Sequence, residues 1–331
     1  MANTAAARAP RRGAQPTNKK SKTRSFWRRY GKHYLGLAPF VIFFAVFILW
    51  PMLYGLVMSF FDWSTRTGDA LTFVGLENFK TVLSEGTQQG KRFLTSLKNL
   101  SVFVALVVPL NLIFATLISL VINQFRGRMH NFLRGAFFMP YVAPFFLATG
   151  VWLWLMSADT GLVAVLLAKI GIGEGVTWRL TPGYFTAFLI IIDLWRAIGF
   201  NMIILTAGMK NIPGDLYEAS TIDGATTFQQ WVHITLPMLE PVLFFVIVNC
   251  FIGAIQTYDI PWVLSNSSAV GVIGGKGAFA SYPVMEIVGN VYSGKAGNLG
   301  RACAEGFVLM LIIFAITLVQ IVYRGRKNKD N

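Results

Sequence analysis

Long runs of apolar residues, separated by short polar stretches, make up most of the chain from residue 35 onward. A helix needs roughly twenty residues to cross about 30 Å of hydrocarbon, and six runs reach that length. Backbone groups in lipid must satisfy their hydrogen bonds within the segment, so we expect these runs to be helices. The alternating pattern of a membrane barrel is absent. The predicted spans are Leu35–Phe61, Leu97–Ile122, Leu133–Met156, Tyr184–Met209, Met238–Ile260 and Ala304–Tyr323.

Composition supports a fold that is all-α and membrane-embedded. The chain is 54% hydrophobic and 13% charged, whereas a soluble domain carries about a quarter charged residues. Its two cysteines, Cys250 and Cys303, have neither disulfide nor zinc spacing. We expect Cys250, within the fifth span, to act as a small buried hydrophobe.

The net charge of +14 is unevenly distributed between the two predicted sides of the membrane. Residues 1–34 form a basic arm without acidic residues, which we expect to be disordered, and residues 324–331 form a short basic tail. The connection after the second span adds Arg126, Arg128 and Arg134, whereas connections 62–96 and 157–183 balance bases with acids. The positive-inside rule therefore places both termini and the second and fourth connections in the cytoplasm. Anionic lipid headgroups, and not nucleic acid, are the expected contact of the basic residues.

The fourth connection, residues 211–237 of the 35–323 membrane domain, is predicted to be a polar helical hairpin. Pro213 suits a first helical turn, and Gly224 is where the first helix should end, because glycine takes a left-handed conformation without penalty. Thr227 and Gln230 have the spacing of a capping box for a second helix. A connection between spans needs only a few residues. Two interpretations remain at this point: a hairpin packed under its own bundle, or a docking element for a soluble partner.

The hairpin sequence resembles the "EAA" loop of ABC importer permeases, in which a glycine, an isoleucine and a Leu-Pro pair follow at fixed offsets. Ser220 replaces the second alanine, a change between small residues. In that family the loop docks into a cleft of the ATP-hydrolysing subunit, so the resemblance implies a coupling role for these residues: Glu218, Ala219, Ser220, Asp223, Gly224, Ile234, Leu236 and Pro237.

The resemblance extends from about Tyr34 to Arg326 and is greatest to the carbohydrate-uptake branch, near the maltose and glycerol-phosphate permeases. "VGLENFKTVL" (Val74–Leu83), "LWRAIGFNMIILTAGMKNIP" (Leu194–Pro213) and "YDIPWVLS" (Tyr258–Ser265) carry it. It implies a sugar-importing permease in a bacterial cytoplasmic membrane, with a second permease, two ATPase subunits and an extracellular binding protein as partners. No cofactor is implied. Ser265–Gly300 departs from the family, being longer and richer in glycine than expected.

Polar residues within the fourth and fifth spans are candidates for a substrate pathway, because ionisable groups in a membrane are costly and tend to face a pathway or a partner. Amides, carboxylates and aromatic rings are also the groups that hold sugars. A mutually neutralising pair, or polar contacts between helices, are the competing explanations. The candidates are Asp193, Trp195, Arg196 and Asn201 on the fourth span and Asn249, Gln256, Tyr258 and Asp259 on the fifth.

Other activities have weaker support. "GVIGGKGA" (Gly271–Ala278) fails as a phosphate loop, because Val270 and Gly277 stand where glycine and Ser or Thr are required. No metalloprotease or nucleophile-elbow motif is present, so we expect a non-catalytic subunit. An ion-coupled secondary transporter would explain Asp193 but would leave the hairpin without a role. A permease for glycerol-phosphate-type substrates remains an alternative within the same class.

Overall fold

The computed structural model describes residues 30, 33, 35–63, 71–157, 160–266, 280–292 and 298–330. Half of the glycine-rich stretch 265–300 lies outside these residues, as do the basic arm apart from residues 30 and 33 and the side chains of the tail from residue 327. The chain divides into two compact units, Met1–Gly55 and Leu56–Asn331.

In the first unit, the described residues form the greater part of one apolar helix. The span runs over Leu35–Met58 and continues past the unit boundary through α2 (Trp50–Met58). Its middle is a π-helical turn, η1 (Ala45–Leu49). No residue in its most apolar window is buried, so the helix presents apolar side chains on all faces, as a segment solvated by lipid does.

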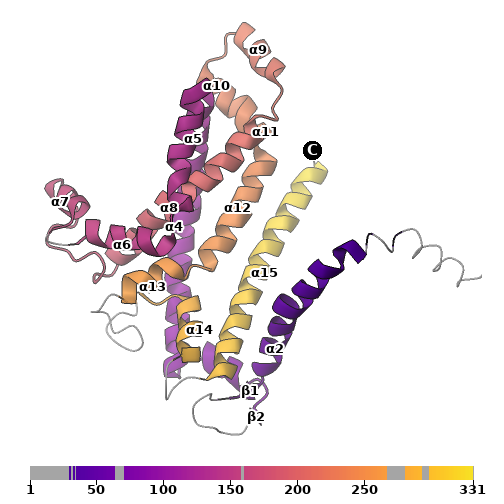
Figure 1. Cartoon of the computed structure of the whole chain (residues 1–331), viewed down its shortest axis with the longest axis vertical. Coiled ribbons are helices and arrows are strands. Elements are labelled where there is room, and N and C mark those ends of the chain that lie inside the picture. The colour runs from indigo at the N-terminus through magenta and orange to yellow at the C-terminus, as the bar shows by residue number, and fades with distance from the viewer. Residues whose placement is uncertain are drawn as a thin grey trace, which may run out of the picture. The chain divides into compact units, whose positions relative to one another are not determined.

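The core of the second unit is a bundle of three long helices, α4 (Gln88–Gln124), α8 (Tyr184–Met209) and α12 (Glu240–Ile255), which pack against one another (Figure 1). Phe103, Phe185, Phe188 and Leu189 are fully buried at its centre. α5 (Gly127–Val142) lies along α8. A close backbone approach sets this contact, because a Cβ at Gly199 would stand 2.0 Å from the carbonyl oxygen of Phe137.

Of the described helices, five are long and apolar enough to cross a membrane, and a bent pair makes six. The third span, predicted as a helix over Leu133–Met156, is not one continuous helix: α5 and α6 (Phe145–Leu155) meet at an angle of 94°. Proline disfavours helical dihedrals in the residue before it, and Ala143, before Pro144, is extended with ψ 136°. The fifth span is also interrupted, between α12 and α13 (Asp259–Asn266).

Shorter elements occupy the two ends of the second unit (Figure 1). At one end lie a two-stranded antiparallel ribbon, β1 (Phe61–Asp62) with β2 (Thr72–Phe73), α3 (Glu77–Leu83), α14 (Pro283–Tyr292) and the start of α15 (Leu299–Asp330). At the other end is the hairpin, made of α9 (Gly214–Ile222), α10 (Thr227–Gln230), η2 (Trp231–Thr235) and α11 (Leu236–Met238). α7 (Leu162–Lys169) follows α6 to the side of the bundle.

Candidate functional site

The hairpin forms as two helices with a glycine turn between them. α9 ends at Ile222, and Gly224 takes a φ of +80°, a conformation that costs glycine nothing. The amide of Ala225 then donates to the carbonyl oxygen of Ser220 at 2.9 Å, which closes the turn. The predicted end of the first helix is thus confirmed, although Pro213 is its N-cap and not its first helical residue.

A capping box starts the second helix, one residue earlier than predicted. The side chain of Thr226 accepts from the amide of Gln229, and the Gln229 side chain accepts from the amide of Thr226 at 2.7 Å. Thr227 and Gln230, the predicted pair, therefore do not form it. Gln230 instead joins the two helices, because its side-chain amide donates to Ser220 Oγ at 2.9 Å and Thr221 Oγ1 at 3.0 Å.

The inner face of the hairpin is packed onto the bundle. Tyr217, Trp231 and Ile234 lie against a buried cluster that includes Met209 at the end of α8 and Leu239 at the start of α12. A hydrogen bond of 2.9 Å between the Tyr217 hydroxyl and Thr235 Oγ1 ties the two hairpin helices together. The hairpin is therefore fixed to the ends of two core helices.

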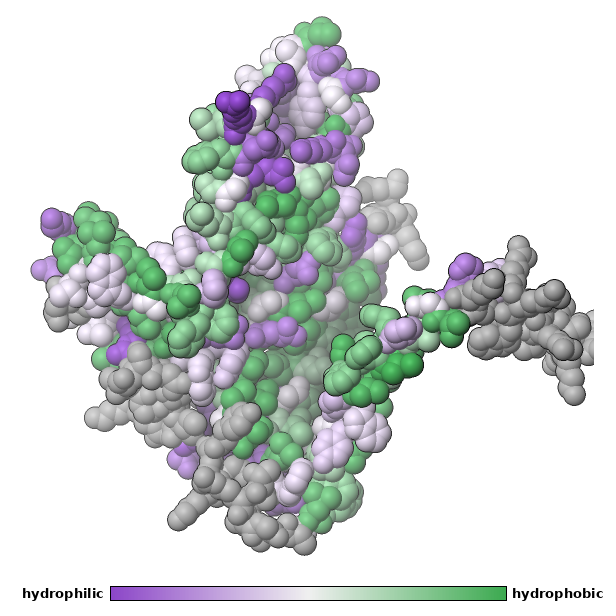
Figure 2. All heavy atoms as spheres, viewed as in Figure 1, coloured by the Kyte–Doolittle hydropathy of each residue, from purple (hydrophilic) through white to green (hydrophobic). Residues whose placement is uncertain are grey.

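The outer face is open and carries most of the predicted coupling residues. Glu218, Ala219, Asp223, Gly224 and Pro237 are exposed, whereas Ser220, Ile234 and Leu236 are half-buried. Two large apolar side chains also point outward, Ile222 with 87% and Phe228 with 69% of its surface exposed. Figure 2 shows mostly hydrophilic residues at this end of the molecule, with hydrophobic ones at its tip. The inner face thus fits a hairpin packed under its own bundle, whereas docking of a soluble partner on the outer face stays a prediction.

A cavity of about 370 Å³ lies among α4, α5, α8 and α12, next to the break between α12 and α13. Seven of the eight predicted pathway residues line it: Asp193, Arg196, Asn201, Asn249, Gln256, Tyr258 and Asp259. The eighth, Trp195, is absent from the lining and packs edge-on against Trp152, with ring centroids 5.8 Å apart.

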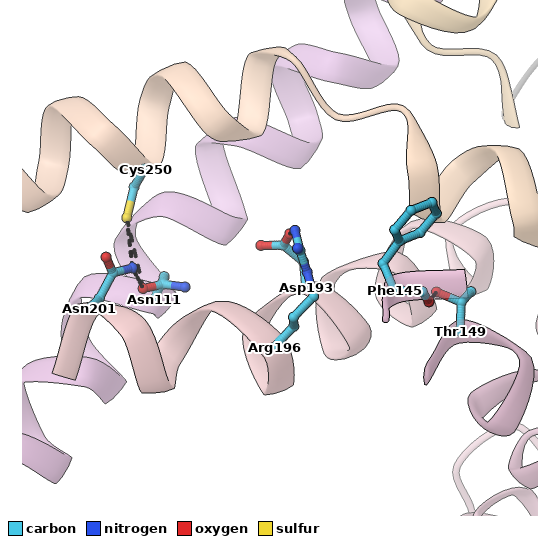
Figure 3. Close-up of polar contacts among 7 residues, drawn as sticks. All are labelled: Asn111, Phe145, Thr149, Asp193, Arg196, Asn201 and Cys250. Carbon is cyan, nitrogen blue, oxygen red and sulfur yellow. Dashed lines mark hydrogen bonds and ion pairs between the residues drawn. The ribbon is translucent and has the colours of Figure 1, made fainter. Parts of the chain in front are cut away.

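One side of the cavity holds a charged pair on α8 (Figure 3). Arg196 and Asp193 are one helical turn apart, with 4.0 Å between Arg196 Nη2 and Asp193 Oδ1. The Nε of Arg196 is buried and has no hydrogen-bond partner among the described residues. A pair this loose can still neutralise its charges, but it leaves the guanidinium with donors to spare.

Another part of the cavity wall is a hydrogen-bonded cluster of side chains from three helices (Figure 3). Asn201 of α8 donates its side-chain amide to Asn111 Oδ1 of α4 at 2.6 Å and to Cys250 Sγ of α12 at 3.2 Å. Asn111 and Asn201 are 2% and 4% exposed. Sequence reasoning missed Asn111, although a lone amide in an apolar span could have indicated it. Cys250 was expected to be a small buried hydrophobe, but it is half-buried and lines the cavity.

The break between α12 and α13 places polar groups on the open side of the cavity. α12 ends at Ile255; Gln256 and Asp259 are exposed at the break, and Asn249 is exposed within α12. The aromatic rings that line the cavity are stacked on neighbours: Tyr258 on Trp262 at 5.5 Å, and Tyr141 on Phe200 at 4.7 Å. Tyr141 and Phe200 were not predicted. The arrangement combines flat apolar faces with amide donors and acceptors, the mixture that small-molecule sites use.

Comparison with known protein families decides what kind of chain carries these two sites. Residues 108–328, which include the hairpin and every residue of the cavity except Val107, match the family described as "Binding-protein-dependent transport system inner membrane component". The chain belongs to this family. The resemblance to ABC importer permeases is thereby confirmed, and the chain is an integral membrane component of a transport system.

Relatives of this permease cover nearly its whole length. The arabinooligosaccharides transport system permease protein of Halalkalibacterium halodurans is 30% identical, covering 90% of this chain and 89% of the relative. The trehalose/maltose transport system permease protein of Thermococcus litoralis is 30% identical, covering 90% and 94%. The sn-glycerol-3-phosphate transport system permease protein of Agrobacterium fabrum is 30% identical, covering 87% and 92%.

Solved structures show that the permease has the fold of known importers. A chain of a bacterial ABC transporter for the acidic polysaccharide alginate superposes with a TM-score of 0.76 at 22% identity, covering 92% of this chain and 99% of that one. A second structure, of an alginate transporter in complex with its pentasaccharide-bound periplasmic protein, gives 0.73 at 23% identity, covering 89% and 94%. At these identities the likeness establishes the fold and not the substrate.

Proposed function

We propose that the chain is one permease subunit of an ATP-driven importer of sugars, with oligosaccharides as the proposed substrates. Relatives named for arabinooligosaccharides and for trehalose/maltose support this substrate class. The observation that carries the proposal is the construction of the cavity, which places exposed amides beside stacked aromatic rings. Sugar hydroxyls pair with the amides, and the apolar face of a pyranose packs on a ring.

Seven side chains are the proposed substrate-pathway residues: Asp193, Arg196, Asn201, Asn249, Gln256, Tyr258 and Asp259. The exposed members, Asn249, Gln256 and Asp259, are free to reach a substrate. Asn201 is committed to Asn111 and Cys250, so its role is to hold the wall together. Trp195, outside the lining, supports the wall through Trp152.

A second permease is proposed to close the pathway. The polar residues at the break between α12 and α13 are exposed on the surface of this chain, where a single chain would present them to lipid. Exposed amides and a carboxylate in hydrocarbon are costly. A homologous subunit packed against that side would remove the cost and would complete the cavity.

The hairpin is the proposed attachment for a separate ATPase, which would hydrolyse ATP in place of this chain. Its inner face is anchored to Met209 of α8 and Leu239 of α12, and these same helices carry Asp193, Arg196 and Asn249 into the cavity. A force on the hairpin therefore moves two walls of the cavity. ATP that binds one conformation of the ATPase more tightly than the other would shift the pathway between inward-facing and outward-facing states.

The proposed location is a bacterial cytoplasmic membrane, with the hairpin and both termini in the cytoplasm. The hairpin and the α4–α5 connection, which carries Arg126 and Arg128, lie at the same end of the second unit (Figure 1). The end with β1, β2 and α14 would then face an extracellular binding protein. A periplasmic protein is in complex with the solved alginate transporter. Two ATPase subunits, one on each permease, complete the assembly.

Uptake by membrane vesicles from cells that produce the complete transporter tests the proposal. The vesicles are prepared with the cytoplasmic face of the membrane inside, and ATP is enclosed in them. We expect radiolabelled trisaccharides to accumulate inside, in the presence of ionophores that abolish ion gradients. Uptake that follows a proton or sodium gradient and ignores ATP would instead establish an ion-coupled transporter. Uptake of no sugar under either condition would reject the substrate class.

A further inference from the structure

The charges that line the cavity do not cancel. Of the residues around it, the charged ones are Asp193, Arg196 and Asp259. Two carboxylates therefore face one guanidinium. The excess is negative, which matters because an ionic substrate in a partly dry cavity interacts with such a charge more strongly than it would in bulk water.

The charges of Asp193 and Arg196 compensate each other. They lie on one face of α8 with 4.0 Å between their charged atoms, and both side chains are largely shielded, at 17% and 33% exposed. The unpartnered Nε of Arg196 could attract an anion. However, an anion bound there would also lie beside the Asp193 carboxylate, whose repulsion offsets the attraction.

Within the described part of this chain, Asp259 is the cavity charge that has no ion-pair partner. It is exposed on the open side of the cavity, and the ion pairs found in the described parts of the chain, Glu77–Lys80 and Asp193–Arg196, do not include it. Asp259 is the first residue of α13 and lines the cavity. Its charge is thus directed toward whatever occupies the cavity.

We propose that this cavity selects uncharged sugar chains and rejects chains that carry carboxylate, phosphate or sulfonate groups, with Asp259 as the residue that determines the selection. This inference rests on the proposed function and narrows it. It separates the chain from relatives named for sn-glycerol-3-phosphate and from the alginate importer, whose named substrates are acidic.

A thiol placed in the cavity measures its charge without any substrate. Gly253 lines the cavity, is exposed, and has no atom within 4 Å of the position that a Cβ would take. We would introduce Gly253→Cys into the full chain within the complete transporter, with Cys250→Ala and Cys303→Ala removing the native thiols. Labelling rates are then compared for a cationic and an anionic methanethiosulfonate of similar size, relative to a small free thiol.

For each thiol we take the ratio of the cationic to the anionic labelling rate. We expect this ratio to be about fivefold or more higher at the introduced thiol than for the small free thiol, as one unit charge lining the same cavity would produce. Asp259→Asn should remove most of that preference. Glu77→Gln removes an exposed acid on α3, away from the cavity, and should leave it unchanged. A rate ratio equal to that of the free thiol, or a preference that survives Asp259→Asn, would overturn the inference. Neither result would bear on whether the protein transports sugars.

Uptake of matched sugars tests the consequence separately. Neutral trisaccharides of glucose, galactose and arabinose are compared with trigalacturonate and trimannuronate in the vesicles described above. Uptake of a neutral sugar with at least tenfold slower uptake of the uronates supports the proposal. Uronate uptake as fast as that of any neutral sugar would overturn it, and uptake of neither kind would reject the proposed function, whatever the thiol reports.

Discussion

Two asparagines in the cavity wall differ in what their side chains do, although they are the same residue type in neighbouring spans. Asn201 is 4% exposed and bonds to side chains of two other helices. Asn249 is exposed and donates at 3.2 Å to Phe245 O on its own helix. Sequence reasoning could identify both as polar residues in apolar spans, but it could not tell them apart, because the distinction depends on which helices meet.

Asn201→Ala should therefore destabilise the bundle, whereas Asn249→Ala should not. Removing Asn201 leaves Asn111 and Cys250 without their shared donor, and polar contacts between membrane helices contribute about 0.6 kcal/mol on average and up to about 2 kcal/mol. We expect a melting temperature in detergent lowered by a few degrees for Asn201→Ala and an unchanged one for Asn249→Ala. Sugar uptake should fall in the Asn249→Ala variant. Equal melting temperatures for the two variants would contradict this assignment.

At the scale of elements, sequence periodicity located the helices well but not their interruptions. The apolar runs predicted the fourth span with the same bounds as α8. The run over Leu133–Met156 gave no sign of the 94° bend. Pro140 and Pro144 are both visible in it, yet Pro140 lies inside α5 and only Pro144 starts a new helix. Proline marks where a helix can bend, and packing of α5 on α8 and of α6 on α13 decides where it does.

Close contact between α5 and α8 depends on Gly199. Gly199→Ala would place a methyl group 2.0 Å from the Phe137 carbonyl oxygen, so the two helices must separate. We expect a loss of stability of about 1–3 kcal/mol, seen as a lower melting temperature. Gly253→Ala on α12 is the matched control: nothing lies within 4 Å of its Cβ, and alanine is the better helix former. A Gly199→Ala variant as stable as Gly253→Ala would show that the helices are not held this closely.

The hairpin should lose its partner when its outer face becomes polar. Ile222→Ser combined with Phe228→Ser removes the two exposed apolar side chains without disturbing Tyr217, Trp231 or Ile234 on the inner face. We expect copurification with the ATPase to fall at least tenfold while the melting temperature of the permease is kept. Leu83→Ser, which changes an exposed apolar residue of α3 at the other end, should have no effect on copurification. Full recovery of the ATPase with the double variant would exclude this face as the contact.

Across the whole molecule, α8 and α12 connect the hairpin to the cavity, because both helices contact the hairpin at one end and line the cavity further along. The EAA-like residues made the hairpin, with its proposed coupling role, recognisable from sequence, because its sequence signature is local. The cavity was recognisable only in part: the charged and amide residues of two spans were visible, but Asn111 and Tyr141 come from α4 and α5. Their contribution depends on how four helices pack, which the sequence pattern does not encode residue by residue.

Crosslinking in intact membranes tests whether a separate ATP-hydrolysing subunit holds the hairpin. A photoreactive residue at Ile222, whose side chain is 87% exposed, would be activated by light in cells that produce the whole transporter. We expect a crosslinked product that contains this chain and the ATPase, with a yield that changes when ATP binds. A product formed only with lipid, or only within this chain, would contradict it.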